Sequence, residues 1–209
     1  MAGNPDNAAL WAEADVYVAP LGTAAPTDGS AVFPVGWVAV GLLDGDDGFT
    51  TTRDQDTNDL YAWGGILVRT SRAHFKLTKG FSVLEDNVTT RSLIWPGSTA
   101  GTIVVPRPES VLLAFETREP GTGKVHRLIT ANSAQVDVDG DVTENETDLT
   151  KYALVATIFP TGDGTLFTEQ VVPPAAGGGA LAAPQDEAVT DAVVVDERAP
   201  AVKGERVSA

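Results

Sequence analysis

Apolar and polar residues alternate with a period of two in several separate stretches of this 209-residue chain. In the clearest stretch, residues 72–83, the odd positions are mostly apolar and the even positions mostly polar. This period puts alternate side chains on opposite faces of a β-strand, so one face is buried and the other is polar. Similar patterns predict strands within 15–19, 111–116 and 134–142, and the apolar run 36–43 is read in the same way. The 21 glycines and 13 prolines agree with a turn-rich, mainly β fold.

Residues 152–159 differ from the other predicted strands because both of their faces are apolar. Tyr152, Leu154 and Ile158 lie on one face, and Val155 and Phe159 on the other. A strand that is apolar on both sides must be covered on both sides. A helix, a second sheet or another subunit is expected to supply the second cover.

One short helix is expected beside these strands. Asp86 or Asn87 can cap its start, residues 88–95 follow, and Pro96-Gly97 ends it. A single helix at about 87–95 with many strands predicts a mainly β fold, a β-sandwich or barrel with one flanking α-helix.

The composition changes once, near residue 172, which divides the chain into a β domain over 1–172 and an extension over 173–209. The extension is rich in Pro, Ala and Gly and has no aromatic residue. Such a segment buries too little apolar surface to offset the entropy of ordering it, so a flexible C-terminal tail is expected. The alternative is that the valines at 193–195 add a strand to a sheet edge of this or a neighbouring subunit.

The net charge of −15 argues against a nucleic-acid groove or an anionic membrane surface as the main partner. There is no cysteine, which excludes disulfides, thiolate zinc sites and a cysteine nucleophile. The first ten residues lack the basic and apolar regions of a signal peptide, and no stretch is long enough to span a membrane. A soluble protein made in a cytosol is expected.

No catalytic site, cofactor or metal site is predicted. His74 and His126 are the two histidines, and both are interpreted as surface residues, since no serine lies in a G-x-S-x-G motif. Residues 121–124 contain Gly and Lys but lack the spacing of a phosphate-binding loop, and they are expected to form a hairpin turn. An enzyme is therefore the weakest class of function.

The segment DVDGDVTENETD at 137–148 resembles a calcium-binding loop but departs from it at two decisive positions. Val142 occupies the sixth position, where glycine is needed, and Asp148 the twelfth, where a bidentate glutamate belongs. The preferred interpretation is a strand with outward Asp137, Asp139 and Asp141 and a turn or bulge at Asp139-Gly140; adventitious cation binding is the alternative.

Residues 44–59 form a long polar segment with six aspartates between two β-like regions. It exceeds a normal hairpin loop in length. It is expected to be a loop that is either mobile and solvated or ordered by a partner, with Phe49 as an apolar anchor that nothing local buries. The contact residues expected in it are Asp44, Asp46, Asp47, Phe49, Arg53, Asp54 and Asp56.

Four basic residues lie close together in this acidic chain: Arg69, Arg72, Lys76 and Lys79. They are interpreted either as a solvated strand face or as a cluster that meets acidic loops of neighbouring subunits and fixes the register of the contact.

Several segments, taken in order, resemble the major tail proteins of long-tailed, non-contractile bacteriophages, especially those that infect actinobacteria. The segments are NPDNAALWAEADVYVAP (4–20), GLLDGDDGF (41–49), YAWGGILVRTS (61–71), LEDNVTTRSLIWPGST (84–99) and VDVDGDVTENETDLTKYALVATIFP (136–160). They span most of residues 1–170. None of them is a catalytic motif, so the resemblance rests on their number and order.

The resemblance implies a structural virion protein of a siphovirus tail. It implies a tail-tube fold, hexameric rings stacked into a tube around the tape-measure protein, and contacts with the tail terminator and tail-tip proteins. The genome would pass through the tube at ejection without specific DNA binding. In this interpretation the segment 44–59 contacts the adjacent ring, and Asp137, Asp139 and Asp141 face the lumen.

A second class of function is a β-sandwich binding module, carbohydrate-binding or adhesin-like, on a virion or cell surface. It would need exposed aromatic residues on a strand face. The four tryptophans stand in apolar or helix-end contexts, which disfavours it: Trp11, Trp37, Trp63 and Trp95.

Overall fold

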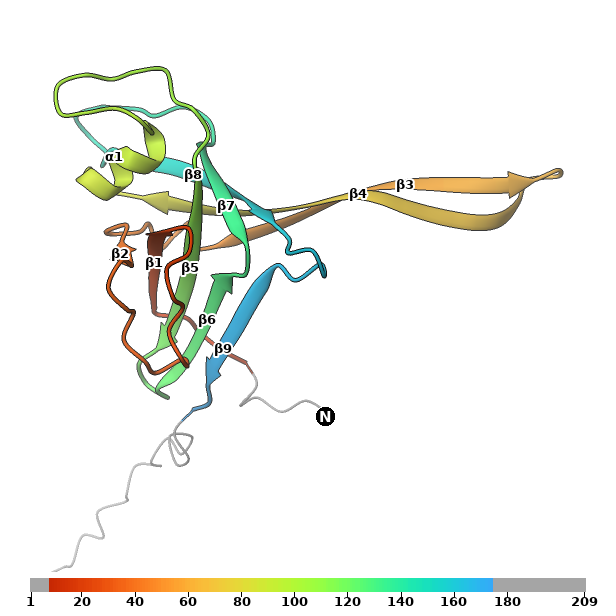
Figure 1. Cartoon of the computed structure of the whole chain (residues 1–209), viewed down its shortest axis with the longest axis horizontal. Coiled ribbons are helices and arrows are strands. Elements are labelled where there is room, and N and C mark those ends of the chain that lie inside the picture. The colour runs from red at the N-terminus through yellow and green to blue at the C-terminus, as the bar shows by residue number, and fades with distance from the viewer. Residues whose placement is uncertain (1–7, 175–209) are drawn as a thin grey trace, which may run out of the picture. The chain divides into compact units, whose positions relative to one another are not determined.

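The computed structural model describes residues 8–174, which contain nine strands and one short helix (Figure 1). In chain order the elements are β1 (Glu13–Pro20), β2 (Val38–Ala39), β3 (Thr50–Ala62), β4 (Ile66–Val83), α1 (Val88–Ile94), β5 (Ser110–Glu119), β6 (Lys124–Thr130), β7 (Ser133–Val138), β8 (Tyr152–Phe159) and β9 (Phe167–Val172). The predicted mainly β fold with one short helix is confirmed. The expected C-terminal extension lies, from residue 175 on, outside the described residues.

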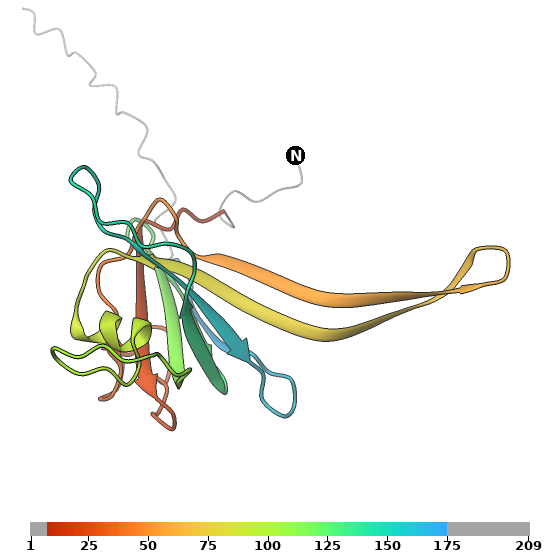
Figure 2. The ribbon, with the colours of Figure 1, turned by 90° about the horizontal axis from the view of Figure 1, so that it is seen from above.

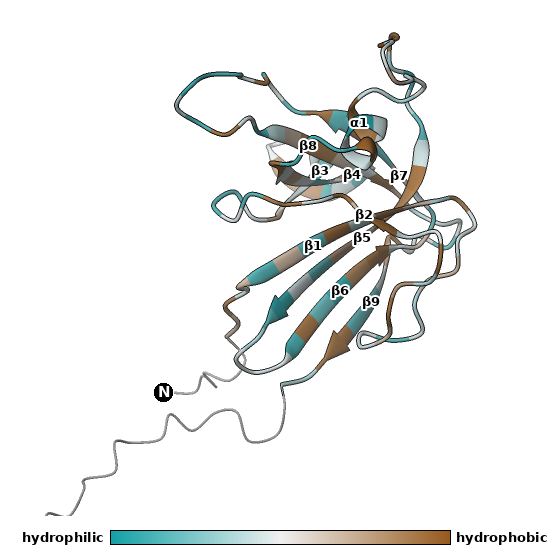
Figure 3. Cartoon of the chain, turned by 90° about the vertical axis from the view of Figure 1, so that its left-hand side faces the viewer, coloured by the Kyte–Doolittle hydropathy of each residue, from teal (hydrophilic) through white to brown (hydrophobic). Residues whose placement is uncertain are grey.

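All strand pairs are antiparallel and belong to one sheet, in the order β2-β1-β5-β7-β8-β4-β3. Strand β6 leaves this path because it pairs with β5 and β9. Strand β5 is the junction: Ser110 and Val111 pair with β7, whereas Ala114–Glu119 pair with β6. Figure 3 shows the result, a layer of β1, β5, β6 and β9 that diverges from the layer containing β8, β4 and β3.

The main core lies between these two layers. Leu113 and Phe115 of β5 meet Phe81 of β4 and Leu154 of β8, and all four side chains are buried. A smaller cluster on the other side of the β1–β5 layer contains Trp37, whose indole N–H donates to the carbonyl of Ala24 at 2.8 Å. Burial of about fifteen large apolar side chains at roughly 1.5–3 kcal/mol each supplies the driving force for this arrangement.

The predicted strands are found with shifted ends. The expected strand over 36–43 shrinks to the two residues of β2, followed by Val40, whose N–H donates to Val16 at 2.8 Å. In β8, Leu154, Ala156 and Ile158 are buried, but Val155 on the other face is only half-buried. Of the two expected covers, residues 8–174 supply a complete one on a single face.

Helix α1 begins where the sequence predicted, with Asn87 rather than Asp86 as the cap. The Asn87 side chain accepts a hydrogen bond from the Thr90 N–H at 2.9 Å and donates to the Val40 carbonyl at 2.7 Å. Asp86 instead pairs with Arg91 at 2.7 Å, and the Arg91 guanidinium lowers the pKa of this carboxyl. Because Leu93 and other residues of the inner face are buried, packing rather than helix propensity holds this short helix.

A buried ion-pair network fastens the long loop between β1 and β2 to the sheet. The Arg127 side chain of β6 donates to Glu116 of β5 at 2.6 Å and to the carbonyls of Asp28 and Ala31 at 2.9 and 3.1 Å. Its guanidinium also lies over the ring of Phe33, 4.3 Å from the ring centroid. The loop is thereby held by charge-assisted bonds in addition to apolar contacts.

Candidate assembly surface: the projecting hairpin

Strands β3 and β4 form a hairpin whose outer part runs away from the other strands (Figure 2). Pairing continues from Thr50 opposite Gly80 to Ala62 opposite Ile66. Beyond Arg53, the remaining nine residues of β3 span about 30 Å at ~3.3 Å per residue. All of β3 is exposed, so within residues 8–174 no element other than β4 packs on this part of the hairpin.

The prediction that residues 44–59 form a loop is wrong from residue 50 on. Asp and Asn are poor strand formers, but a continuous partner strand overrides propensity. Cross-strand polar pairs support it: Thr70 donates to Asp59 at 2.8 Å, and Asp56 contacts the His74 ring at 2.9 Å. His74 lies at a register shift and has a φ of 53°.

The tip of the hairpin is apolar. Gly64 and Gly65 both have positive φ, as a tight hairpin turn requires. The side chain of Trp63 is fully exposed, with a relative accessibility of 101%. Other large exposed apolar side chains surround it: Leu60, Tyr61, Ile66, Leu67 and Val68. In the sequence Trp63 stands among apolar residues, but nothing in that pattern shows that this apolar segment is exposed to solvent.

The expected contact residues fall into two groups. Asp44, Asp46, Asp47 and Phe49 lie on the body before β3 begins, whereas the other three lie on the hairpin: Arg53, Asp54 and Asp56. Phe49 has a local partner, contrary to expectation, because its ring packs edge-on against Phe115 at a centroid distance of 5.5 Å.

Lys151, the residue before β8, holds the loop 44–47 to the body. Its ammonium lies 3.1 Å from Asp44 and 2.8 Å from Asp47. Asp47 also accepts a hydrogen bond from the Ser82 hydroxyl at 2.6 Å. Bonding to Lys151 lowers the pKa of both carboxyls and raises the pKa of the lysine.

The four basic residues do not form one cluster. Arg69, Arg72 and Lys76 are exposed on the outer hairpin, with Lys76 opposite Asp54. Lys79 is instead buried on the inner face of β4, 6% exposed, and burial lowers its pKa. The alternation in 72–83 indicates this burial, because Lys79 is at an odd position and therefore lies on the same face as the core residues of this strand.

The three expected lumen acids are all exposed, but only Asp137 lies in a strand. It stands opposite Val155 on the face of β7 that points away from the core. The N–H of Asp139 donates to the carbonyl of Ala153 at 2.8 Å, and Gly140 turns the chain with a φ of 88°. The predicted strand and the turn at 139–140 are found, but the strand ends at Val138, so the prediction that Asp139 and Asp141 lie on its outward face is wrong.

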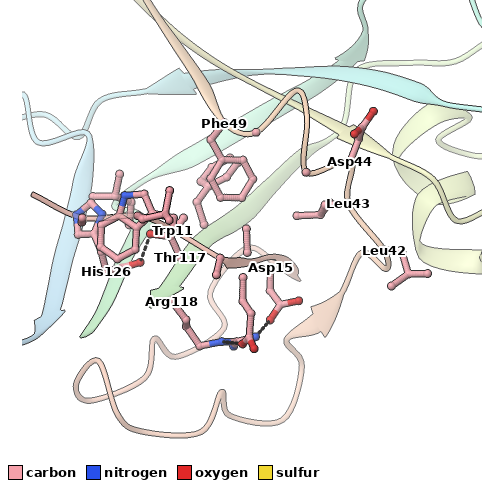
Figure 4. Close-up of a pocket in the computed structure, with 18 of the residues that line it drawn as sticks. Trp11, Asp15, Leu42, Leu43, Asp44, Phe49, Thr117, Arg118 and His126 are labelled. Atoms are coloured by element: carbon pink, nitrogen blue, oxygen red, sulfur yellow. Dashed lines mark hydrogen bonds and ion pairs between the residues drawn. The ribbon is translucent and has the colours of Figure 1, made fainter. Parts of the chain in front are cut away.

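A groove opens at the root of the hairpin, between the loop 41–49 and strands β1 and β5 (Figure 4). It has a volume of about 780 Å³ and walls formed by Trp11, Leu42 and Phe49. At one side Arg118 pairs with Asp15 at 2.5 Å and with Glu13 at 3.1 Å.

Nothing in the described part of the chain assembles a catalytic or metal centre. His74 contacts Asp56, and His126 contacts Glu169 at 2.8 Å. Of the two, His74 is exposed as expected, and His126 is half-buried beside Trp11. Residues 8–174 contain no group of three or more His, Cys, Asp or Glu side chains placed to hold a metal ion. Across the same residues, no helix is long and apolar enough to cross a membrane.

A family model described as phage tail tube protein matches residues 1–169. The chain belongs to this phage tail tube protein family. A tail tube protein is a structural component of the virion that assembles with its own copies into a tube, and it is not an enzyme. The expected resemblance to phage tail proteins is thus confirmed.

No match was found among curated proteins. Among solved structures, the chain is similar to a chain of the sheath–tube complex of an extracellular contractile injection system, PVC, in its extended state. The two share 10% identity with a TM-score of 0.36, over 82% of this chain and 99% of the other.

Proposed function

We propose that this tail tube protein forms hexameric rings that stack into the tube of a long-tailed, non-contractile siphovirus. The tube surrounds the tape-measure protein, ends at the tail terminator and tail-tip proteins, and conducts the genome at ejection. The observation that carries the proposal is the β3–β4 hairpin, whose exposed apolar tip has no role in the fold of its own subunit. An element of this kind needs a second copy.

The hairpin makes the contact between copies heterologous, because one subunit offers the hairpin and the next offers a different surface. Such contacts close into rings when their rotation permits. Asp54 and Asp56 on β3 contact the adjacent ring, and Arg72 and Lys76 on β4 meet acidic segments of neighbouring subunits. The charges set the register of this contact, and apolar area supplies most of its affinity.

The lumen is lined by the outer face of the β7–β8–β4–β3 layer. In the strand register, Asp137 of β7, Val155 of β8 and Gly80 of β4 stand side by side on the face away from the core. The half-buried Val155 lies in the middle of this layer. Asp137 is therefore the first of the three acids proposed to face the lumen, with Asp139 and Asp141 at its edge.

The charge of the tube wall gives a mechanism for passage of DNA. Residues 1–172 contain 23 acidic and 11 basic side chains, a net charge of −12, or about −72 for six copies. A wall of this sign releases no counterions from the phosphates, so DNA does not adhere to it. Since screening limits the repulsion to about 8 Å, the wall centres the duplex and does not drive ejection.

The assembly is tested by mass measurement and negative-stain imaging of the purified protein over a range of concentrations, together with analysis of purified phage particles. The expected result is hollow tubes built of sixfold rings, and the protein as an abundant component of the particle. A chain that stays monomeric at every concentration and is absent from particles would refute the proposal.

The lumen assignment is tested separately by Asp137→Lys. Particles that carry this variant are expected to eject DNA more slowly, because the wall now attracts phosphate. Asp148→Lys, in an exposed loop outside the strand, is the matched control. Unchanged ejection for Asp137→Lys would show that this acid does not face the lumen.

A further inference from the structure

The hairpin tip is uncharged, apolar and exposed. Residues 60–68, LYAWGGILV, carry no charge, although the chain as a whole carries −15. Ile66 and Val68 are 67% and 68% exposed beside the fully exposed Trp63. An uncharged apolar tip can enter a site on a second acidic copy without charge repulsion, and its burial removes a large apolar area from water.

The groove at the hairpin root presents a matching unpartnered surface. Leu42 is 70% exposed and Trp11 39% exposed at its rim. Phe49, which is labelled in Figure 4, lines the groove together with Phe115. Its volume of about 780 Å³ is sufficient for an indole ring together with neighbouring aliphatic side chains.

Lys79 gives the groove a specific chemical preference. Its ammonium lies 5.3 Å from the centroid of the Phe49 ring and 5.1 Å from that of Phe115. Its hydrogen-bond partner within residues 8–174 is the neutral hydroxyl of Thr51 at 3.3 Å, and no carboxylate of these residues balances its charge. The rings of Phe49 and Phe115 therefore form two sides of an aromatic cage around the ammonium. Tryptophan is the side chain that binds a cation most strongly through its ring face, so it is the best third side.

We propose that the hairpin tip of one subunit docks in this groove of a neighbouring subunit, with the Trp63 ring completing the aromatic cage around Lys79. This inference rests on the proposed assembly and names the partner of the tip. Each subunit offers one tip and one such groove. A subunit whose tip is docked in one neighbour still has its groove free for the tip of another, so the contact can repeat from copy to copy.

The absence of cysteine from the chain permits a direct test by disulfide cross-linking. The variant with Ala62→Cys and Leu42→Cys retains Trp63 and alters one exposed tip residue and one exposed rim residue. Mild oxidation of assembled tubes is expected to give a ladder of covalent multimers, because a disulfide forms only when the two Cα atoms come within about 7 Å. The matched control joins Ala62→Cys to Leu21→Cys, which lines a different groove near α1, and it should give no ladder.

The outcomes separate this inference from the proposed function. Tubes that form normally without a ladder from the Ala62–Leu42 pair, or with a ladder from the Ala62–Leu21 pair, would overturn the docking site and leave the tube role standing. Failure of the wild-type chain to form tubes or to enter particles would overturn the tube role itself.

A second readout tests the aromatic cage. Trp63→Ala is expected to raise the concentration needed for assembly about tenfold or more, as for a buried aromatic anchor, and Trp63→Phe by less. Val35→Ala, which truncates an equally exposed apolar side chain elsewhere, should leave it unchanged. In combination with Lys79→Met, the effect of Trp63→Ala should shrink. Strictly independent effects of the two changes would refute contact between these side chains.

Discussion

Replacing Phe49 by alanine should destabilise the folded monomer, because this side chain belongs to the body. Truncation of a fully buried phenylalanine costs about 3–5 kcal/mol, and Phe49 is half-buried, so about 2 kcal/mol is expected from packing. Its edge-on contact with Phe115 adds about 1 kcal/mol. Water that reaches Lys79 in the variant offsets part of this loss by hydrating a buried ammonium. The net expectation is about 2 kcal/mol.

The assay is thermal unfolding followed by circular dichroism, at a concentration where light scattering shows monomers. For a domain of this size each kcal/mol shifts Tm by about 2–4 °C, so Phe49→Ala should lower Tm by about 4–8 °C. Trp63→Ala is the matched control and should change Tm by little, because a fully exposed side chain contributes less than about 0.5 kcal/mol. If Phe49→Ala melted within 1 °C of the wild type, the loop 41–49 would not be packed on β5 as described.

Three further changes test other parts of the structure. Charge reversal of Arg72 and Lys76 to glutamate should block tube formation and leave the monomer folded, whereas Arg107→Glu, exposed off the hairpin, should leave both tube formation and the fold intact; normal-length tubes from the double variant would refute the contact. Glu116→Gln should lower the free energy of unfolding, measured in urea, by about 3–5 kcal/mol, because it leaves the buried guanidinium of Arg127 on β6 without this counter-charge. A decrease below about 1 kcal/mol would contradict this. Lys151→Met should destabilise the fold at pH 7, where the two aspartates it binds are ionised. Because the lysine lowers the pKa of both carboxyls in the folded state, the difference in stability from wild type should shrink as the pH falls and these carboxyls become protonated; a difference that did not shrink with falling pH would count against the pairing.

The sequence correctly predicted those strands and the helix whose local residue pattern matches their environment in the fold. The alternation in β1 and β5 matches the fold, where their alternate apolar side chains face the main core, and the Asn87 cap of α1 stands where the sequence placed it. The doubly apolar pattern of 152–159 predicts a strand, and β8 forms there between β7 and β4, with one of its two faces buried.

The projecting hairpin was harder to predict, because β3 becomes a strand only through its pairing with β4. Thr50–Asp59 has the composition of a solvated loop, and only its pairing with β4 makes it a strand. Phe49 and Lys79 lie thirty residues apart in sequence, so no local pattern shows that the lysine sits over the phenyl ring. The exposed tip was missed for a similar reason, since an apolar segment ordinarily indicates burial.

The anchoring of the hairpin also sets when a newly made chain becomes able to polymerise. An isolated two-stranded ribbon is marginal in water, and the support for this one comes from the pairing of Leu77–Val83 with β8. Strand β8 ends at Phe159, nearly a hundred residues after the turn at Gly64-Gly65. Translation must therefore pass β8 before the tip is held in place, so nascent chains on neighbouring ribosomes are kept from joining until each body is nearly complete.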